Sequence, residues 1–437
     1  MDDVMSDLIK RDHDTLWHPC SQMKDYETFK PLITHSASGS YITLSNGQKI
    51  IDAISSWWCK SLGHGHPKLK AALIKQLDYF EHIILANTTN NNIIELSERL
   101  SSLTKNLNKV LYASDGSCAV EIAMKMSIHA RQITGEVSRY KFMALSNGYH
   151  GETGLALSVS DLGIYSDPYK AILINTIFLE NIPYVNNKQD PLWEDCSSYW
   201  PDIEKQLEQH KDQLTAIIIE PIVQAAGGML IYSKDFLQRL RKWTAQYNIH
   251  LIADEIMTGL YRTGLPLACN HADIEPDFLC LGKGLTAGFL PLSAVLIPNK
   301  IYELFYDDYE AGKSFLHSHT HTGNALAISV ALENLKIIKT EIIDHEDLLA
   351  ELMNEVAEST GKLNNIRNIG SVVAADLISP TPIPRMGYKV YQEAIKLGAL
   401  LRPLGNTLYW VPPMNISKEV LYKLKDITRN AIVAAYR

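Results

Sequence analysis

Short apolar runs alternate with amphipathic segments through the middle of this chain. The segments 118–134 and 236–247 carry apolar residues at the spacing of a helix. Runs of strand length that are apolar on both faces, and that alternate with helices, are typical of a parallel sheet covered by helices. The pattern therefore predicts an α/β fold with a mostly parallel sheet. The predicted strands span residues 109–113, 140–145, 215–219, 249–253, 278–281 and 293–297.

The two ends of the chain have a different pattern. Residues 41–53 predict a hairpin with an Asn46-Gly47 turn, and helical spacing recurs at 67–80 and 91–104. Two helical segments, short strands and a proline-rich loop follow residue 320 and predict a smaller α+β domain. These helices span 325–340 and 345–363, and the loop spans 379–384. We expect an N-terminal segment at 1–60 that packs with the small domain, a large domain at 61–315 and a small domain at 316–437.

Composition excludes several functions. The formal net charge of −8 argues against nucleic acid or an anionic membrane as the main partner, because both attract a basic face. No apolar stretch approaches the length of a membrane span, and residues 1–10 lack the apolar core of a signal peptide. The six cysteines show no CxxC spacing, which fits reduced thiols in a cytoplasmic protein.

Lys283 follows the apolar run 278–281 and lies between Gly282 and Gly284. A lysine that folding removes from water loses part of the stability of its charged form, so its pKa falls and the amine becomes nucleophilic. Such an amine can form a Schiff base with an aldehyde. Taken alone, a Gly-Lys-Gly turn is more often an exposed loop, because short motifs occur by chance.

Asp254 ends the predicted strand 249–253, at the edge of a parallel sheet where active sites lie. Asp254 and Ile256 would share one face, since side chains alternate along a strand. A buried carboxylate needs a positive partner, and the protonated pyridine nitrogen of pyridoxal phosphate would serve. For this aspartate alone, a helix cap or a salt bridge is the simpler interpretation.

Two further segments could complete a cofactor site. Gly116 and Ser117 lie between a predicted strand and a helix, where free N–H groups and the helix dipole favour a phosphate. Tyr149 lies near two glycines after the strand 140–145 and could lie flat on a cofactor ring. An ordinary helix cap and a packed tyrosine are the alternatives, but the four signals together favour pyridoxal phosphate.

These segments resemble class III aminotransferases of fold type I, and the similarity runs from Trp17 to Pro413. Within that class, the chain is most similar to the group that acts in biotin synthesis, the diaminopelargonate aminotransferases. The Trp57-Trp58 pair and the Arg402-Pro403 segment point to this group. The segments that carry the resemblance are 55–58, 147–151, 219–224, 259–264 and 401–405.

The resemblance implies a role for each motif residue. Lys283 would be the catalytic residue and would hold the cofactor's aldehyde. Asp254 would pair with the pyridine nitrogen, and Thr320 would reach the phosphate from the neighbouring subunit of a homodimer. The implied cofactor-binding residues are Gly116, Ser117, Tyr149, Asp254, Ile256, Lys283 and Thr320. The implied substrate-binding residues are Trp57, Trp58, Tyr149, Lys283, Ser318, Arg402 and Tyr409.

The implied reaction is the amination of 8-amino-7-oxononanoate to 7,8-diaminononanoate in two half-reactions. Arg402 would hold the far carboxylate of the keto substrate, a task suited to a forked guanidinium. The resemblance favours S-adenosylmethionine as the amino donor, with lysine as the alternative. Trp57-Trp58 supports the first donor, whereas the segments 22–27, 306–310 and 317–319 look more like enzymes that use lysine.

Two positions depart from the pattern of this group. Cys20 replaces a tyrosine that helps to shape the substrate pocket, so this change bears on the size of the pocket and on the recognition of the donor. Glu152 replaces an aspartate after Tyr149-His150-Gly151, which keeps the charge and lengthens its reach. We expect this second change to tune the site.

Three other functions compete with this interpretation. One is another class III aminotransferase that acts on ornithine, 4-aminobutyrate or a polyamine, because Glu220 is shared with those enzymes. A second is a zinc protein, because His317, His319 and His321 alternate and would face one way on a strand. No acidic or cysteine partner lies near them, so we expect no metal. The third is a non-catalytic cofactor carrier, which the complete set of Lys283, Asp254 and phosphate turn argues against.

Overall fold

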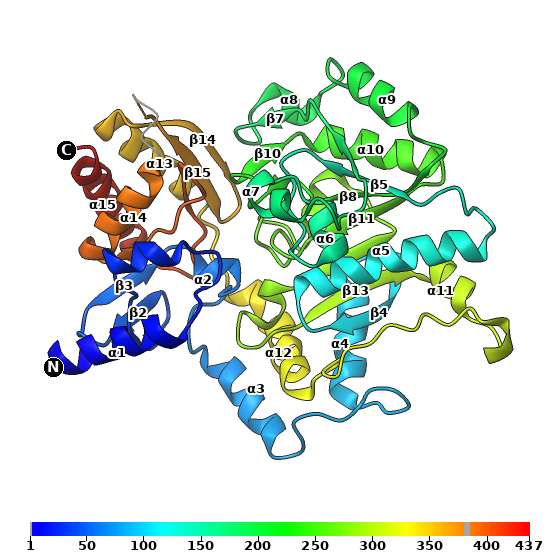
Figure 1. Cartoon of the computed structure of the whole chain (residues 1–437), viewed down its shortest axis with the longest axis horizontal. Helices are drawn as coiled ribbons and strands as arrows, with labels where there is room; N and C mark the ends of the chain where they lie inside the picture. The colour runs from blue at the N-terminus through cyan, green and yellow to red at the C-terminus, as the bar shows by residue number, and fades with distance from the viewer. Residues whose placement is uncertain (1, 380–384) are drawn as a thin grey trace.

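The computed structural model describes residues 2–379 and 385–437, with side chains from residue 5 onward. Two lobes lie side by side (Figure 1). The larger lobe is built from the middle of the chain, and the smaller lobe holds both termini. The loop predicted at 379–384 lies almost wholly outside the described residues.

A seven-stranded sheet forms the centre of the large lobe, in the order β4-β13-β12-β11-β8-β5-β6. The five strands from β12 to β6 run parallel, whereas β13 is antiparallel to both β12 and β4. The prediction of a mostly parallel sheet is therefore confirmed. The strands are β4 (Leu107–Ala113), β5 (Lys141–Leu145), β6 (Ile177–Leu179), β8 (Leu214–Ile219), β11 (His250–Asp254), β12 (Phe278–Leu281) and β13 (Ser293–Pro298).

Helices cover this sheet because their apolar faces need burial. Helix α5 crosses five strands of the sheet, and α12 packs against α3 and α4 below it (Figure 1). A small sheet of β7 (Tyr184–Val185), β10 (Leu230–Tyr232) and β9 (Val223–Gln224) lies beside α8. The helices of this part are α3 (Pro67–Leu77), α4 (Asn91–Ser101), α5 (Gly116–Ile133), α6 (Gly154–Ser158), α7 (Gly163–Ser166), α8 (Pro191–Glu194), α9 (Trp200–Glu208), α10 (Lys234–Gln246), α11 (Asn299–Phe305) and α12 (Ala325–Glu341).

The small lobe combines both ends of the chain. Strand β16 pairs in parallel with β3, so C-terminal and N-terminal residues share one sheet of order β1-β2-β3-β16. A second sheet has the order β14-β15-β17. The strands are β1 (Thr34–Ser38), β2 (Tyr41–Leu44), β3 (Lys49–Asp52), β14 (Leu363–Ile369), β15 (Val372–Leu377), β16 (Ala399–Leu400) and β17 (Thr407–Trp410). The helices are α1 (Asp2–Thr15), α2 (Ser55–Trp58), α13 (Glu346–Thr360), α14 (Met386–Leu397) and α15 (Lys418–Ala435).

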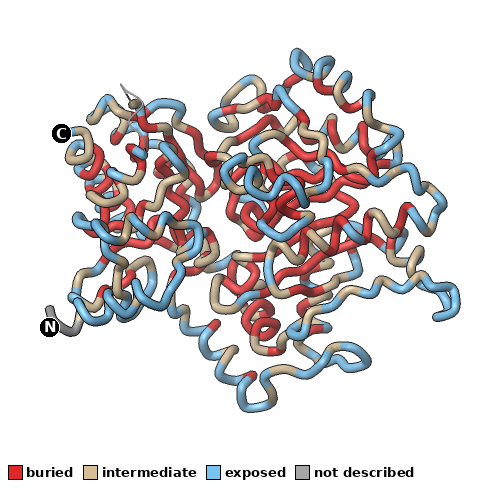
Figure 2. The backbone as a smooth tube through the Cα atoms, in the orientation of Figure 1, coloured by how far each residue is buried: buried red, intermediate tan, exposed pale blue. Residues whose placement is uncertain are grey.

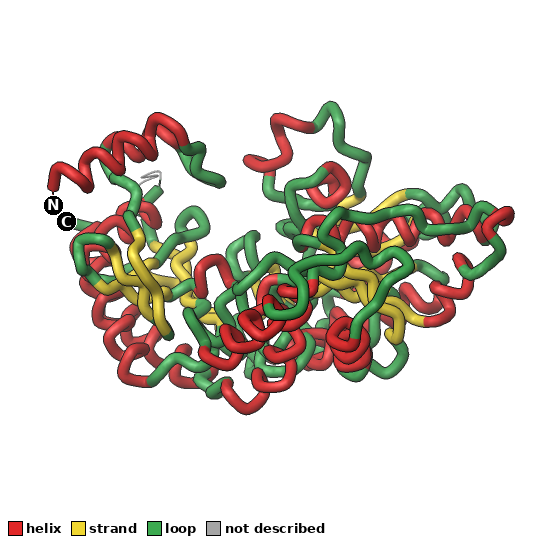
Figure 3. The backbone as a smooth tube through the Cα atoms, turned by 90° about the horizontal axis from the view of Figure 1, so that it is seen from below, coloured by secondary structure: helices red, strands yellow, loops and turns green. Residues whose placement is uncertain are grey.

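The predicted hairpin and most predicted helices are confirmed, but the helical segments expected at 67–80, 91–104 and 345–363 each end three residues early, at Leu77, Ser101 and Thr360. The helix expected at 345–363 stops at Thr360, because Gly361 adopts a φ of +61° that ends the helix. Helix α1 was not predicted, and it lies at the edge of the small lobe (Figure 3). The domain bounds 1–60, 61–315 and 316–437 stay a prediction.

Each lobe has a buried interior (Figure 2). The strands of the central sheet are buried throughout β8, β11, β12 and β13, as expected for a sheet covered on both faces. Within residues 2–379 and 385–437, no helix is long and apolar enough to cross a membrane.

Asp277 stabilises the amino end of the central sheet. Its carboxylate accepts hydrogen bonds from Arg241 (2.7 Å), Lys300 (2.7 Å) and the Leu251 N–H (3.0 Å). Burial would raise the pKa of Asp277, but Arg241 and Lys300 outweigh it and lower the pKa to about 2. Because the folded pKa lies below the unfolded one, this carboxylate stabilises the fold above pH 4, and the effect is lost as the pH falls towards 2.

We therefore expect Asp277→Asn to lower the free energy of unfolding by about 2 kcal/mol at neutral pH. The deficit relative to the wild type should shrink as the pH is lowered from 5 to 3. Urea titrations of both proteins across this pH range measure the difference in their free energies of unfolding. A deficit that stays constant with pH would show that the charge of Asp277 does not contribute.

Candidate active site

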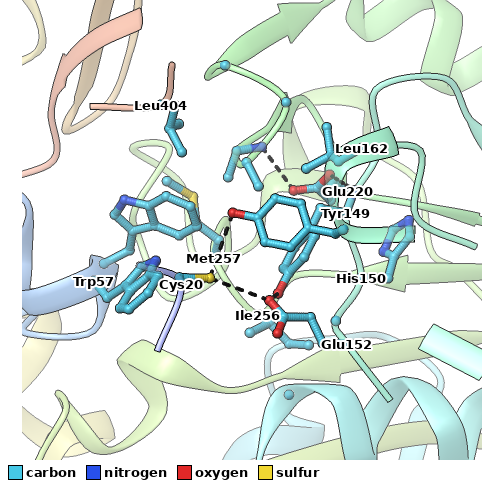
Figure 4. A pocket seen from close by; sticks show the side chains of 18 of the residues that line it. Cys20, Trp57, Tyr149, His150, Glu152, Leu162, Glu220, Ile256, Met257 and Leu404 are labelled. Atoms are coloured by element: carbon cyan, nitrogen blue, oxygen red, sulfur yellow. Dashed lines mark hydrogen bonds between the residues drawn. The ribbon is translucent and has the colours of Figure 1, made fainter. Parts of the chain in front are cut away.

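A cavity of about 1220 Å³ opens at the carboxyl ends of the parallel strands, between the two lobes. The N-terminal segment contributes Cys20 and Trp57, and the small lobe contributes Leu404 (Figure 4). The large lobe contributes Tyr149 and Glu220. This is the edge of the sheet where the sequence predicted a site.

Lys283 follows β12 at the floor of the cavity, with a φ of +37°. Its glycine neighbours permit close packing, because a Cβ on Gly284 would lie 2.9 Å from Ser61 Oγ, and one on Gly282 would lie 3.2 Å from the side chain of Ile256. Burial lowers the pKa of Lys283, while the negative charges of Asp254 and Glu220 act against this shift. The amine is therefore more easily deprotonated than an exposed lysine, as a nucleophile or base requires.

Asp254 ends β11 and is held in one orientation. Its Oδ2 lies 2.8 Å from Nδ1 of His150, and its Oδ1 accepts the N–H of Ile256 at 3.1 Å. Both Asp254 and His150 are buried. A carboxylate fixed in this way can receive a positive ring nitrogen without first having to reorient.

The first turn of α5 forms the end of the cavity where an anion would fit. Asp115 caps the helix through the N–H of Cys118 at 3.0 Å, so the helix begins firmly at Gly116. A Cβ on Gly116 would lie 3.0 Å from Cδ1 of Ile256, and one on Gly151 would overlap Ser117 Oγ. Both positions therefore have no room for a side chain, at the place where the positive end of an 18-residue helix meets the cavity.

Tyr149 is fixed from two directions. Its N–H donates to Glu220 (2.9 Å), and its hydroxyl donates to Glu152 (2.8 Å). Burial and the hydrogen bond to Glu152 both raise the pKa of Tyr149, so the hydroxyl stays protonated. The Cys20 thiol lies 3.9 Å from the same Glu152 oxygen and 3.8 Å from the hydroxyl of Tyr165 (Figure 4). The two departures from the family pattern, Cys20 and Glu152, therefore meet each other.

The two tryptophans line the cavity on the side of the small lobe. Trp58 packs against Nζ of Lys283, whose distance to the ring centre is 5.3 Å, and its indole N–H donates to the hydroxyl of Tyr409 at 3.3 Å. The guanidinium of Arg402 lies 5.0 Å from the Trp57 ring and donates to the main-chain carbonyl of Cys20 at 2.6 Å. Among the described residues, no carboxylate lies within 4.0 Å of Arg402. Arg402 is therefore an available cation at the cavity wall.

Thr320 and Ser318 do not line this cavity. Both are exposed in the loop between α11 and α12. Their predicted contacts with the cofactor phosphate and the substrate of a neighbouring subunit stay a prediction.

The histidines of the same loop do not lie on a strand, which the zinc alternative required. Nε2 of His317 lies 3.3 Å from Nε2 of His319, whereas His321 packs on the ring of His82. Within the described part of the chain, no three His, Cys, Asp or Glu side chains are placed to hold a metal ion.

Sequence reasoning missed several residues that line the cavity. His150 belongs to the segment 147–151, but its spacing from Asp254 gives no signal that the two side chains would pair. The sequence marks Glu220 only through the resemblance to class III aminotransferases, but its carboxylate also accepts the N–H of Ala225, and burial raises its pKa to about 7. Tyr165 and Arg385 lie in segments without a motif.

The residues present fit pyridoxal phosphate. The cradle at Gly116, the fixed carboxylate of Asp254 and the buried amine of Lys283 match the phosphate, the ring nitrogen and the aldehyde of this cofactor. Tyr149 supplies an aromatic ring in the same cavity (Figure 4). The fold and the site together define an aminotransferase that depends on pyridoxal phosphate.

The comparisons with known proteins agree with this class. The family described as aminotransferase class-III matches residues 22–432, and the chain belongs to that family. A relative from Helicobacter pylori is 40% identical, and the alignment covers 95% of each chain. One from Aquifex aeolicus is 37% identical over 97% of each chain. Both are adenosylmethionine-8-amino-7-oxononanoate aminotransferases.

The solved structures show the same relationship. The crystal structure of the enzyme of that name from Methanocaldococcus jannaschii superposes with a TM-score of 0.89 at 30% identity, covering 98% of this chain and 99% of that one. An amine transaminase from an uncultivated Pseudomonas species, solved with pyridoxal phosphate bound, superposes with a TM-score of 0.84 at 28% identity, covering 97% and 98%.

Proposed function

We propose that this chain aminates 8-amino-7-oxononanoate to 7,8-diaminononanoate in biotin synthesis, with S-adenosylmethionine as the amino donor. The names of its relatives support this acceptor and this donor. The structural observation that carries the proposal is Arg402, a cation at the cavity wall without an acidic partner among the described residues. A long keto acid with a terminal carboxylate would supply that partner.

Pyridoxal phosphate, when bound, supplies an aldehyde that accepts the amino group and a ring that withdraws electrons. The residues of this chain do the rest. Lys283 holds the cofactor and then moves the proton at the substrate carbon that bears nitrogen, as general base and acid. Asp254, oriented by His150, would place its negative carboxylate beside the ring nitrogen and so keep that nitrogen protonated. Trp57 and Trp58 shield the reacting carbon from water and lead the chain of the acceptor towards Arg402.

Arg402→Ala should raise the KM for 8-amino-7-oxononanoate about 100-fold, because a charge-assisted bidentate pair contributes about 3 kcal/mol. The kcat should change much less, since Arg402, in the described part of the chain, contacts Cys20 and Trp57 rather than Lys283. Steady-state assays with the acid and with its methyl ester test this, and the ester should be used equally by the wild type and the variant. An unchanged KM for the acid would show that Arg402 does not bind the carboxylate.

A comparison of substrates tests the proposed acceptor against the substrates of other class III aminotransferases. Wild-type enzyme should aminate 8-amino-7-oxononanoate with a kcat/KM at least about 100-fold above that for transamination of ornithine or 4-aminobutyrate, since a site with a dedicated polar anchor discriminates strongly. Faster turnover of ornithine or 4-aminobutyrate would overturn the assignment of the substrate and leave the class intact.

The donor can be identified in the first half-reaction. We propose S-adenosylmethionine, in keeping with Trp57-Trp58 and with the names of the relatives. Mixing the holoenzyme with S-adenosylmethionine and, separately, with lysine should change its visible absorbance only with the first. A change with lysine alone would reverse the choice of donor.

We also propose that the enzyme works as a cytoplasmic homodimer. Thr320 and Ser318 are exposed and lie outside the cavity of their own chain, which supports a role at the site of a neighbouring subunit. Leu316, next to them in sequence, is 87% exposed, as an interface residue would be in a single chain. Sedimentation of the purified enzyme should give twice the mass of one chain.

A further inference from the structure

The turn that carries the two tryptophans is left-handed. Ser55, Ser56, Trp57 and Trp58 have φ values of +50°, +45°, +77° and +69°. Residues with a side chain rarely enter this region, and they normally do so one at a time, because Cβ approaches the next carbonyl oxygen. Four in a row are a strained conformation that the surrounding structure must hold, and such strain concentrates at functional sites.

A buried carboxylate holds this turn. Oδ1 of Asp52 accepts the N–H of Ser56 at 2.9 Å and that of Ile54 at 3.4 Å. Oδ2 of Asp52 accepts the Ser56 hydroxyl at 2.7 Å and lies 2.8 Å from Nε2 of His64. Asp52 is completely buried. Burial would raise its pKa, but the hydrogen bonds from His64 and Ser56 outweigh this effect and lower the pKa of Asp52.

His64 is itself anchored. Its N–H donates to the carbonyl of Gly39 at 2.8 Å, and its carbonyl accepts the N–H of Gly39 at 2.9 Å. The two loops pass so closely there that a Cβ on Gly63 would lie 2.7 Å from the Gly39 oxygen. The imidazole therefore reaches Asp52 from a fixed support.

The left-handed turn determines where the two indoles lie. Consecutive side chains of an extended strand point to opposite faces, yet Trp57 and Trp58 both line the same cavity. Trp57 lies against the guanidinium of Arg402, and Trp58 lies against the amine of Lys283. Relaxation of the turn would move both indoles relative to the two cations.

We propose that His64 and Asp52 are positioning residues for the acceptor, which they control by locking Trp57 against Arg402. The proposal rests on the proposed function, because Arg402 is taken to bind the acceptor's carboxylate. His64 does not line the cavity, so it acts only through the turn. A purely structural His64 would affect stability without a selective effect on the acceptor.

The test compares His64→Leu, which removes the donor to Asp52, with His64→Gln, whose amide N–H can replace it. In the holoenzyme, His64→Leu should raise the KM for 8-amino-7-oxononanoate about tenfold with kcat within about twofold, whereas His64→Gln should stay within about threefold of the wild-type KM. His271→Leu is the matched control, because His271 is also partly buried and outside the cavity, but its side chain bonds to Thr263 and, among the described residues, makes no hydrogen bond or ring contact with Asp52 or the turn.

A double-mutant cycle shows whether His64 acts through Trp57. In a Trp57→Ala background, His64→Leu should have no further effect on KM, since coupled residues are not additive. Effects that multiply, or an unchanged KM in His64→Leu, would overturn the proposal.

If His64→Leu does not fold, Ser56→Ala and Ser56→Gly replace it. Both lose the hydroxyl, but only glycine tolerates a φ of +45°, so Ser56→Ala should have the higher KM, and the reverse order would contradict the proposal.

A second measurement does not depend on the acceptor. In holoenzyme labelled with 5-fluorotryptophan, the Trp57 signal, assigned by its loss in Trp57→Ala, should shift in His64→Leu and stay in place in His64→Gln and His271→Leu. An unmoved Trp57 signal in His64→Leu would overturn the positioning role. A moved signal in an enzyme that does not use 8-amino-7-oxononanoate would keep the positioning role and reject the proposed function.

Discussion

Replacing Lys283 by alanine is expected to reduce kcat by about 10⁴-fold or more, because the variant loses both the covalent anchor of the cofactor and the group that moves the proton. The visible absorbance of the holoenzyme should also change, since it depends on the bond to this lysine. Steady-state turnover and an absorbance spectrum of the purified variant measure the two effects.

Lys60 provides the matched control for this experiment. It is also partly buried, burial lowers its pKa, and its ammonium donates to the carbonyl of Gly288 at 2.7 Å. It does not line the cavity. Lys60→Ala should therefore keep its absorbance and most of its turnover. Turnover in Lys283→Ala comparable to that of Lys60→Ala would overturn the mechanism.

The second large effect is expected at Asp254. Asp254→Asn should reduce kcat by about 10³-fold, because a neutral amide cannot keep the ring nitrogen of the cofactor positive, and the electron-withdrawing power of the ring depends on that charge. The variant should still bind the cofactor through Lys283 and the first turn of α5. Turnover and the amount of bound cofactor are measured on the same preparation.

Asp277→Asn is the control for Asp254, because both aspartates are buried at the ends of neighbouring strands. Asp277 lies just before β12, at the end of the sheet opposite to the one that carries Asp254. Its carboxylate is bonded to Arg241 and Lys300. Its loss should reduce stability and leave kcat nearly unchanged. If both variants lose turnover to the same extent, the effect of Asp254 is structural.

The sequence predicted the large lobe well because its signals are local. The strands at 214–219, 250–254 and 278–281 are buried on both faces and appear as continuous apolar runs. Lys283 and Asp254 follow directly from these strands, so their place at the carboxyl edge followed from the order of the elements. Gly116 and Tyr149 were predictable for the same reason.

The small lobe and the cavity wall were harder to predict, because they depend on contacts between distant residues. The carbonyl of Cys20 meets Arg402 across 382 positions of the chain. The pairing of His150 with Asp254 spans 104 positions. No periodicity or short motif encodes such pairs, since each forms only when segments far apart in the chain fold together within one lobe.

The left-handed turn at Ser55–Trp58 shows the same limit in the backbone. Ser-Ser-Trp-Trp has no glycine, so nothing local indicates positive φ values. Asp52 and His64 impose the conformation from either side of the turn. The resemblance to a family located Trp57 and Trp58 in the substrate channel, but the reason that both point into it became visible only in the structure.

A single turnover of the aminated enzyme is the most direct test of the central claim. Holoenzyme is converted by the amino donor, freed of excess donor and mixed with one equivalent of 8-amino-7-oxononanoate. We predict one equivalent of 7,8-diaminononanoate and the return of the original absorbance. The absence of this product, with the absorbance restored instead by the semialdehyde derived from ornithine or from 4-aminobutyrate, would contradict the account.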